Sequence, residues 1–264
     1  MKKLYYLSSL PRSGNTVLAS ILNQNPKIAC TSNSIVTDIL KNINSLKIGP
    51  TSYNNFPDKK SFDNVLKNVS QNYYKDWKQD VIIDRGTWGT PPNYKFVLDY
   101  LDKKPKIILL VRDVIEVLAS FIDWSNKNPN TFLNSYGATV HEKCSTLMNT
   151  NGLIVRQLVS IRHILQHTDP KLNLLIKYND FVKNPKKTID KIYKFLEVKP
   201  FKHTFKNIKQ FEVNNVKYDD SVMGANMHTI KTKKIEKTKR DIKKLLPDSV
   251  IKEWDIPELK VWTN

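Results

Sequence analysis

The chain has 264 residues, of which 43 are Lys or Arg and 25 are Asp or Glu, so its formal net charge at pH 7 is +18. A chain of this length can bury a sizeable core as one α/β domain or two small ones, and its charge favours anionic partners such as nucleotides, nucleic acid, acidic polymers or membrane surfaces. The longest apolar run, residues 107–111, is far too short to span a bilayer. The two cysteines are too few for a disulfide framework and lack the spacing of a zinc site. We therefore expect a soluble protein of the reducing cytoplasm.

The first distinctive stretch runs from Ser8 to Thr16 and reads S-S-L-P-R-S-G-N-T. It follows an apolar run at residues 4–7 and precedes apolar residues at helical spacing over 17–22, which predicts a strand, a turn and the start of a helix. Backbone N–H groups at such a turn point along the helix dipole and can bind a phosphate. We expect a nucleotide phosphate there. The alternative is a structural corner in which Pro, Ser and Gly only make a tight turn.

The stretch departs from the phosphate-loop pattern G-x-x-x-x-G-K-[ST] at two positions. Gly14 and Thr16 fall in place, but Ser9 stands for the first Gly and Asn15 for the Lys. The ammonium that reaches the β- and γ-phosphates in ATPases and kinases is therefore missing. Positive charge comes instead from Arg12, whose guanidinium can grip phosphate oxygens through two hydrogen bonds. This argues against an ordinary ATPase or kinase.

Helices and strands alternate over the following hundred residues. The run 106–111 is almost continuously apolar, as a buried strand of a parallel sheet requires. Alternation of this kind implies right-handed parallel crossovers, so we predict an α/β fold with a central parallel β-sheet flanked by helices. The expected strands cover 27–30, 81–83 and 106–111, the expected helices 35–46, 61–77 and 93–101, and the expected loop 49–60.

The second half of the chain continues the alternation and then becomes basic. Asn184 as cap and Pro185 at the first helical position begin a helix that ends near residue 196. Residues 231–244 hold eight Lys or Arg against two acids, which indicates either a solvated face or an anion-binding segment. The other expected elements are a helix from 114, an Asn-rich loop or lid over 124–133, helices around 137–148 and 153–166, and a strand over 174–176.

A second phosphate-binding element follows the strand 106–111. Arg112 leaves the strand end, and Ser120 stands eight residues later on the predicted helix. Two helical turns allow this guanidinium and this hydroxyl to converge on a second phosphate of the same nucleotide. Taken alone, the pair Arg112-Asp113 fits a structural salt bridge or a helix cap equally well. A plain ATP enzyme has no use for a second, separate phosphate site.

Three stretches together resemble the sulfotransferase family. P-R-S-G-N-T is similar to the P-R-S-G-T-T loop of its tyrosylprotein branch, K-I-I-L-L-V-R-D-V-I-E-V-L-A-S to its 3′-phosphate site, and L-L-I-K-Y-N-D-F-V-K-N-P to its Y-E-D-L segment. Ser9 replaces the family's usual Gly. The resemblance implies a three-layer, P-loop-like fold in a single domain over 1–264, with the basic segment 199–264 closing over the site. It also implies metal-independent, in-line transfer of a sulfuryl group from 3′-phosphoadenosine-5′-phosphosulfate (PAPS) to a hydroxyl or amine, which leaves 3′,5′-adenosine diphosphate (PAP).

The resemblance assigns roles to individual residues. Arg12 would neutralise charge on the leaving phosphate, and Arg85 stands where the tyrosylprotein branch has a catalytic Lys. Tyr178 would lie near the adenine; an edge-of-core aromatic is the alternative. Lys231 would close over the 3′-phosphate. The donor-binding residues are expected to be Arg12, Ser13, Gly14, Asn15, Thr16, Arg112, Ser120, Tyr178 and Lys231.

The acceptor hydroxyl needs a general base within hydrogen-bond reach. The glutamate that the tyrosylprotein branch carries shortly after Cys30 is absent, and Ser32 and Asn33 occupy the region. Asp84, at the end of the strand 81–83, is the candidate base; alternatively, it orients Arg85 or caps a turn.

The acceptor stays open among small molecules, glycans and peptides. Trp88 and Trp124 can wall an acceptor site or pack in the core. His163 and His167 lack the Glu of a metal-dependent hydrolase, which favours a solvated helix face over a metal site. We expect no nucleic-acid partner because no such motif is recognisable. Two alternative functions remain: a P-loop NTP-dependent kinase, which needs magnesium, and a non-enzymatic basic protein that binds nucleic acid or anionic polymers with steep salt dependence.

Overall fold

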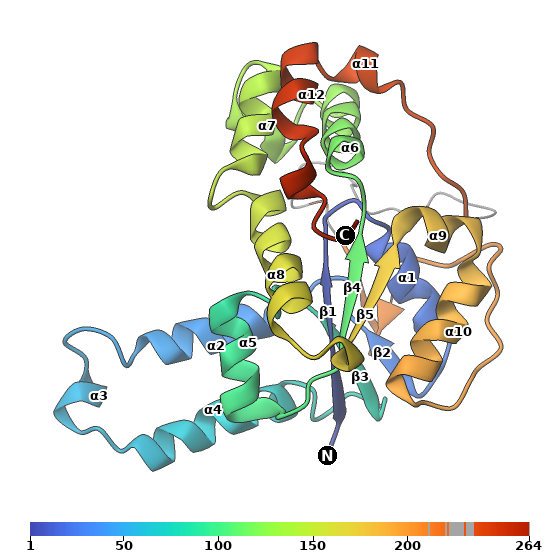
Figure 1. Ribbon diagram of the computed structural model, residues 1–264. Coiled ribbons are helices and arrows are strands. Elements are labelled where there is room, and N and C mark those ends of the chain that lie inside the picture. Colours follow the sequence, from blue (N-terminus) through green and yellow to red (C-terminus); the bar gives the residue numbers. More distant parts are fainter. Residues whose placement is uncertain (211, 220, 222–229, 231–234, 264) are drawn as a thin grey trace.

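A five-stranded, fully parallel sheet forms the centre of the molecule, with strand order β2-β3-β1-β4-β5. The computed structural model describes residues 1–210, 212–219, 221, 230 and 235–263. The prediction of an α/β fold with a central parallel sheet is confirmed (Figure 1). The strands are β1 (Lys3–Ser9), β2 (Ile28–Cys30), β3 (Val81–Arg85), β4 (Ile107–Val111) and β5 (Asn173–Lys177).

The middle strand β1 carries the turn of interest at its carboxyl end. Tyr6 is in register with Asp84 of β3 on one side and with Ile107 of β4 on the other. The segments that follow these three strands therefore leave the sheet at one common edge. In open parallel sheets this carboxyl edge is where ligands bind.

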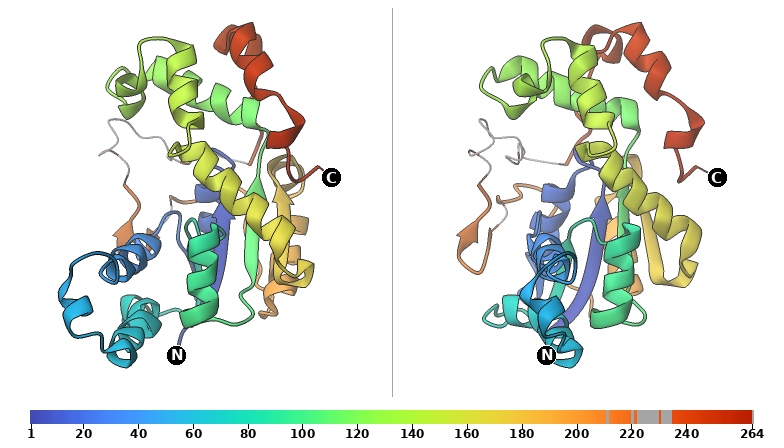
Figure 2. Two further views of the ribbon diagram at one scale, coloured as in Figure 1. Left: turned by 60° about the vertical axis from the view of Figure 1, so that its left-hand side comes forward. Right: turned by 90° about the vertical axis from the view of Figure 1, so that its left-hand side faces the viewer.

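Helices cover both faces of the sheet, which gives three layers (Figures 1 and 2). Side chains alternate between the faces along a strand. Tyr5 of β1 donates a hydrogen bond to the carbonyl of Leu196 at the end of α10, whereas the ring of Tyr6 packs on Trp88, 4.9 Å away, on the opposite face. One layer contains α1 (Asn15–Leu22), α9 (Tyr178–Lys183) and α10 (Pro185–Leu196); the other contains α2 (Val36–Ser45), α4 (Lys59–Tyr73), α5 (Pro91–Phe96) and α8 (Leu153–His167).

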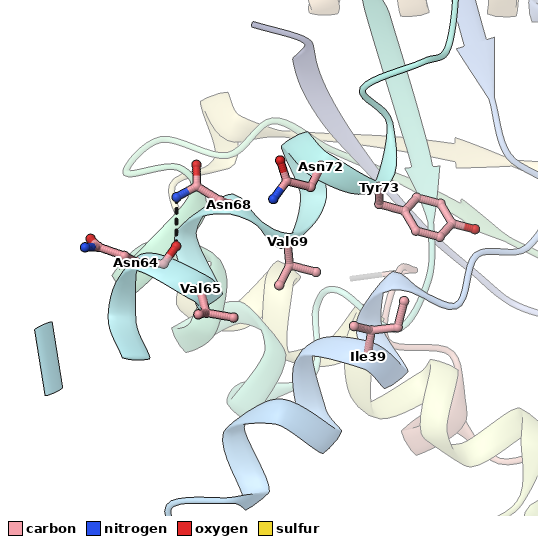
Figure 3. Close-up of a pocket in the computed structure, with 7 residues that line it drawn as sticks. All are labelled: Ile39, Asn64, Val65, Asn68, Val69, Asn72 and Tyr73. Atoms are coloured by element: carbon pink, nitrogen blue, oxygen red, sulfur yellow. Dashed lines mark hydrogen bonds between the residues drawn. The ribbon is translucent and has the colours of Figure 1, made fainter. Parts of the chain in front are cut away.

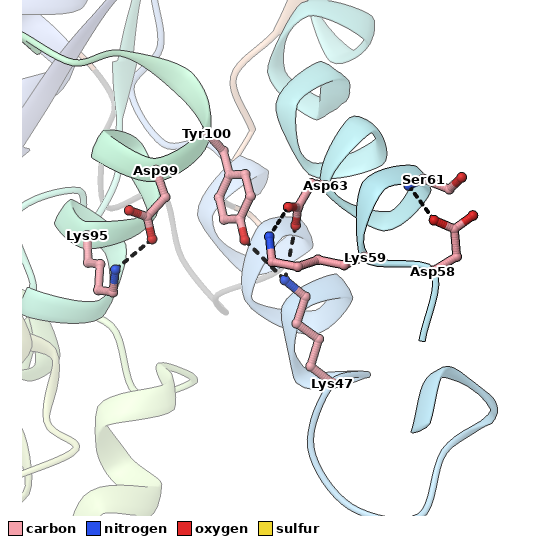
Figure 4. Close-up of polar contacts among 8 residues, drawn as sticks. All are labelled: Lys47, Asp58, Lys59, Ser61, Asp63, Lys95, Asp99 and Tyr100. Carbon is pink, nitrogen blue, oxygen red and sulfur yellow. Dashed lines mark hydrogen bonds and ion pairs between the residues drawn. The ribbon is translucent and has the colours of Figure 1, made fainter. Parts of the chain in front are cut away.

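The α2–α4 hairpin projects from one edge of the molecule (Figure 1). The loop expected over 49–60 is interrupted by the short helix α3 (Ser52–Asn55), and α4 begins earlier than predicted because Asp58 accepts the Ser61 N–H and caps it. Figure 4 shows polar contacts at the loop end of the hairpin, where α2 has ended and α4 begins. Lys47 pairs with Asp63 of α4 and donates a hydrogen bond of 3.1 Å to Tyr100, on the π-helical turn Val97–Leu101.

The loop predicted over 124–133 begins later than expected. Helix α6 (Val114–Lys127) runs past Trp124, whose buried ring packs on Phe132 at 5.7 Å, so tertiary contacts extend the helix. Helix α9 follows β5 directly at a place where no helix was predicted. The remaining described elements are the 3₁₀ turns Phe132–Tyr136, Pro170–Leu172 and Pro257–Leu259, α7 (Val140–Met148), β6 (Glu212–Val213), β7 (Val216–Lys217), α11 (Ile242–Leu245) and α12 (Asp248–Trp254).

The C-terminal helices lie against α6 and α7 at the top of the view in Figure 1. No helix in the described part of the chain combines the length and the apolarity that crossing a bilayer requires.

Candidate functional site

The turn after β1 is held in shape by its own side chains. Ser13 donates a 2.5 Å hydrogen bond to the carbonyl of Leu10, and Asn15 Nδ2 donates to the same oxygen at 3.1 Å. Gly14, with a φ of 91°, provides the left-handed conformation that ends the turn and begins α1. No described side chain caps α1, so its first N–H groups are available to an anion.

Arg12 joins this turn to the start of α6. Its Nε donates to Ser120 Oγ at 3.1 Å, and its own carbonyl accepts a 2.8 Å hydrogen bond from Arg112 Nη1. Direct hydrogen bonds therefore join the two segments that were predicted to bind phosphates. Asp113 caps α6 by accepting the Glu116 N–H, so the helix-cap alternative for this residue is also realised.

Glu116 balances the cations beside this site. It accepts from Arg112 Nε at 2.9 Å, while its other oxygen pairs with Lys237 at 2.5 Å. These cations hold the pKa of Glu116 below its usual range, against the effect of partial burial. Glu116 thus stays ionised and fixes both cations.

Tyr178 lies under Arg112 at the first position of α9. The guanidinium carbon of Arg112 is 4.2 Å from the centre of the Tyr178 ring, a cation–π contact. The ring is buried and also lies close to Gly14. Tyr178 is therefore a wall shared by the turn and by Arg112.

The basic C-terminal segment crosses α6 next to these residues. Arg240 pairs with Asp123 at 2.9 Å, and with the Lys237–Glu116 pair this fastens the segment to the helix. A cavity of about 370 Å³ lies between them, lined by Arg112, Glu116, Ala119, Lys237, Thr238, Lys239, Arg240 and Ile242. Lys237, Arg240 and Glu116 were not predicted from the sequence, whose signals for them were the Glu one helical turn after Arg112 and the basic run 231–244. Lys231 lies outside the described residues.

Arg85, at the end of β3, lies beside the turn after β1. Its Nε donates to Ser9 Oγ at 3.2 Å and its Nη1 to Asn33 Oδ1 at 2.9 Å. Its backbone N–H donates to Thr31 Oγ1 at 2.8 Å. Loop 31–34 is fixed in turn to α1, because Ser32 and Thr16 share a 3.2 Å hydrogen bond between their hydroxyls.

Asp84 lies on the opposite face of the sheet from the Arg85 side chain. Its Oδ2 accepts from Tyr74 at 2.5 Å and from Ser34 at 3.2 Å, and the carboxyl is buried. Burial raises its pKa to about 6, although these hydrogen bonds oppose the rise. Among the described residues it forms no ion pair with Arg85.

The remaining candidates lie in the core or on helix α8. Trp88 and Trp124 are both buried, which favours core packing. His163 is only half-buried and contacts the Gly89 carbonyl at 2.9 Å; its ring stacks on that of exposed His167, so the expected solvated face holds for His167 alone. Groups of acidic, His and Cys side chains suited to a metal ion do not occur in the described ranges.

A second hollow lies away from the strand ends, between α2 and α4 (Figure 3). It has a volume of about 560 Å³ and is lined by Ile39, Asn64, Val65, Asn68, Val69, Asn72 and Tyr73. Its lining carries no charged side chain, so it does not suit the phosphates of a nucleotide.

Comparison with known proteins agrees with the geometry. The sulfotransferase domain family matches residues 5–256. Mouse sulfotransferase SULT7A1, solved in complex with PAP, is 16% identical over 96% of this chain and 82% of its own, with a TM-score of 0.56. A sulfotransferase from Alicyclobacillus acidocaldarius is 11% identical over 77% of this chain and 85% of its own, with a TM-score of 0.53. The sulfotransferase domain of the Synechococcus PCC 7002 olefin synthase is 16% identical over 87% of this chain and 84% of its own, with a TM-score of 0.51. No curated protein matches the chain in sequence.

Proposed function

The chain belongs to the sulfotransferase domain family, and on this premise we propose that PAPS binds across the turn after β1 and the start of α6. The 5′-phosphosulfate would occupy the turn of residues Arg12 to Thr16. The 3′-phosphate would lie against Arg112 and Ser120. One observation carries the proposal: Arg12 contacts Ser120 with its side chain and Arg112 with its carbonyl, so both phosphate elements meet at one residue.

The residues present fit such a nucleotide. The uncapped start of α1 supplies backbone donors, Arg12 supplies positive charge at the turn, and Arg112 and Lys237 supply it around one carboxylate, Glu116. Arg112 is in position to exchange Glu116 for a phosphate oxygen. Tyr178 offers an aromatic face for the adenine. We also propose that Lys231 contributes to closing the basic segment over the 3′-phosphate.

The chemistry asked of the chain is positioning and charge stabilisation. An acceptor oxygen or nitrogen forms a bond to sulfur while the bond between sulfur and the bridging phosphate oxygen breaks, and the electron pair leaves on the 5′-phosphate of PAP. Arg12 would stabilise that developing charge, and Arg85 would stabilise the sulfuryl oxygens.

Asp84 is our candidate for the group that takes the acceptor's proton. A carboxyl with a pKa of about 6 is ionised at neutral pH and more basic than an exposed one. The hydrogen bonds from Tyr74 and Ser34 both end on Oδ2, so the buried Oδ1 would take the proton.

The cellular setting is part of the proposal. Cys30 and Cys144 are both free and buried, which suits a reducing cytoplasm. We propose that the chain acts there as a single domain and without a metal ion, because Arg12 and Arg85 offer the charge stabilisation that a metal would otherwise supply. The acceptor is a small molecule, a glycan or a peptide.

Calorimetry tests the donor site without an acceptor. PAP, ADP and ATP are titrated into the wild type and into Arg112→Ala, each with magnesium and with a chelator. We expect metal-independent binding of PAP that depends on the 3′-phosphate and falls at least tenfold in Arg112→Ala. Arg156→Ala, which changes an exposed arginine on α8, is the matched control and should bind PAP like the wild type.

The other outcomes separate the alternatives. Preference for ATP with magnesium would support a kinase, which the family match does not favour. Anion binding with no nucleotide preference, steeply weakened by salt and unchanged in Arg112→Ala, would indicate a basic binding protein instead.

A further inference from the structure

Three side-chain oxygens accept hydrogen bonds from Arg85. They come from the ends of β1 and β2, the two strands that flank β3. Ser9 Oγ accepts from its Nε, Asn33 Oδ1 from its Nη1, and Thr31 Oγ1 from its backbone N–H. Ser9 is fully buried at the end of the central strand β1, whereas Asn33 is exposed in the loop after β2. Arg85 is therefore hydrogen-bonded to residues on both sides of it along the carboxyl edge of the sheet.

Two bonds to one guanidinium fix its plane. The group is flat and carries five N–H donors in a rigid fork, so holding Nε and Nη1 also sets the direction of Nη2. Within the described part of the chain, Nη2 makes no hydrogen bond. It remains as a pair of oriented donors beside the turn after β1.

The resemblance to the tyrosylprotein branch implies Gly at position 9 and Lys at position 85, where this chain carries Ser9 and Arg85. A lysine carries all its donors on one terminal nitrogen and has no counterpart of the Nε–H that Ser9 accepts from Arg85. A guanidinium beside Gly would leave its Nε without this partner at a buried site. The two departures are thus chemically matched to one another.

From this contact we propose that Ser9 and Asn33 are positioning residues that orient the Arg85 guanidinium toward the transferred sulfuryl group. The inference rests on the proposed function, because it needs PAPS in the turn after β1. The hydroxyl of Ser9 sets the plane of the guanidinium, and Asn33 keeps the outer edge of that plane from turning toward solvent. Oriented donors lower a barrier more than mobile ones because they need no reorganisation during the reaction.

A double-mutant cycle tests the match. The acceptor-independent hydrolysis of PAPS to PAP is measured as a rate at saturating PAPS, together with the dissociation constants of PAPS and PAP, for the wild type, Ser9→Ala, Arg85→Lys and the double variant. Ser9→Ala should lower the rate about tenfold, the effect of one hydrogen bond to a charged group, and Asn33→Ala about threefold because its bond is exposed. The PAP affinity of each variant should stay within about twofold of the wild-type value, because Arg85 would contact the sulfuryl group, which PAP lacks.

The decisive result lies in the Arg85→Lys background. There, Ser9→Ala should change the rate by less than about twofold, because the Nε donor it serves is gone. An equal tenfold loss in both backgrounds would overturn the proposal, since Ser9 would then act without Arg85. Ser8→Ala makes the same change one residue earlier, where the hydroxyl bonds to Gly89 and Ser160 on the other face, and should leave the rate unchanged.

PAP binding and PAPS hydrolysis together separate an error in the donor site from an error in the positioning role of Ser9 and Asn33. If PAP does not bind the wild type at all, the donor site itself is wrong. If PAP binds and the Ser9 and Asn33 variants hydrolyse PAPS like the wild type, only the positioning role is wrong. Melting temperatures of each variant confirm that the compared proteins are folded.

Discussion

The Nε of Arg12 lies 3.1 Å from the Oγ of Ser120, although the two residues belong to different β–α units of the chain. Ser120 is buried, and Arg12 has a left-handed backbone with a φ of 59°. A non-glycine residue rarely adopts this conformation and needs support from its surroundings. The contact with α6 gives Arg12 that support and joins the two halves of the proposed donor site.

Replacing Ser120 by Ala should therefore weaken PAP binding about tenfold, through the loss of a hydroxyl at the proposed 3′-phosphate position. ADP binding should fall by less, since ADP reports only the 5′-phosphates and the indirect effect on Arg12. Calorimetry of both nucleotides measures the difference. Ser125→Ala on the same helix is the control. Equal losses for PAP and ADP would mean that Ser120 acts only through Arg12.

Gly14→Ala should lower the free energy of unfolding by about 1–2 kcal/mol, because an L-residue is strained at a φ of 91°. The added methyl would lie 3.4 Å from Phe181 and 3.5 Å from Tyr178, which is ordinary contact, so the cost is in the backbone. Urea unfolding measures it. Gly49→Ala introduces the same strain at a φ of 82° with open space around it. Both variants should lose similar stability, but only Gly14→Ala should weaken PAP binding.

The buried carboxyl of Asp84 should make stability fall as pH rises from about 4 to about 6. Its folded-state pKa, about 6, exceeds the ordinary value of 3.8, so the folded protein binds more protons in this range. The shift corresponds to about 3 kcal/mol, fully present below pH 4 and lost above pH 6. Asp84→Asn should remove this dependence in urea unfolding across pH 4–7. Asp80→Asn, an exposed neighbour, should keep it.

If Asp84 also takes the acceptor's proton, the PAPS hydrolysis rate should rise with pH up to about 6 and then level off. Asp84→Asn should lower the plateau by about 10²–10⁴ and abolish the rising limb. Rates at saturating PAPS between pH 5 and pH 8.5 give the profile. A variant that keeps the wild-type profile would show that Asp84 is only a buried structural carboxyl.

Lys237→Ala should weaken PAP binding and reduce its salt dependence, because the ammonium lies beside Arg112 through their shared partner Glu116. Titrations at two salt concentrations measure both effects. Lys243→Ala on α11 changes a lysine of the same basic run away from this pair. Identical salt dependence in the wild type and Lys237→Ala would place the proposed 3′-phosphate elsewhere.

Local patterns predicted the sheet and the turn after β1, because both depend on consecutive residues of the sequence. The apolar run of β4 and the spacing of Gly14 and Thr16 need no knowledge of the rest of the fold. Helix α9 was not predicted because it is short and has no side-chain cap at Lys177. The extension of α6 was missed because Trp124 is held by Phe132, a contact made only in the folded chain.

Most contacts of the site that were not predicted from the sequence join residues from distant segments. Arg85 meets Ser9 and Asn33 only because β2, β3 and β1 are adjacent in the sheet. Glu116 meets Lys237 because the C-terminal segment crosses α6. Asp84 was predicted as a base from its neighbour Arg85, but alternation along β3 sends the two side chains to opposite faces. Single-sequence spacing contains no information on strand order.

The central place of β1 also governs how the chain folds during synthesis. This strand is made first, yet its two sheet partners, β3 and β4, are made much later. Until residue 111 has emerged, this strand of the nascent chain has at least one unpaired edge, and pairing must wait for distant segments. Such an edge favours association between unfinished chains. Slowed translation ahead of β4 should therefore lower the yield of soluble protein, and prompt delivery of β4 should raise it.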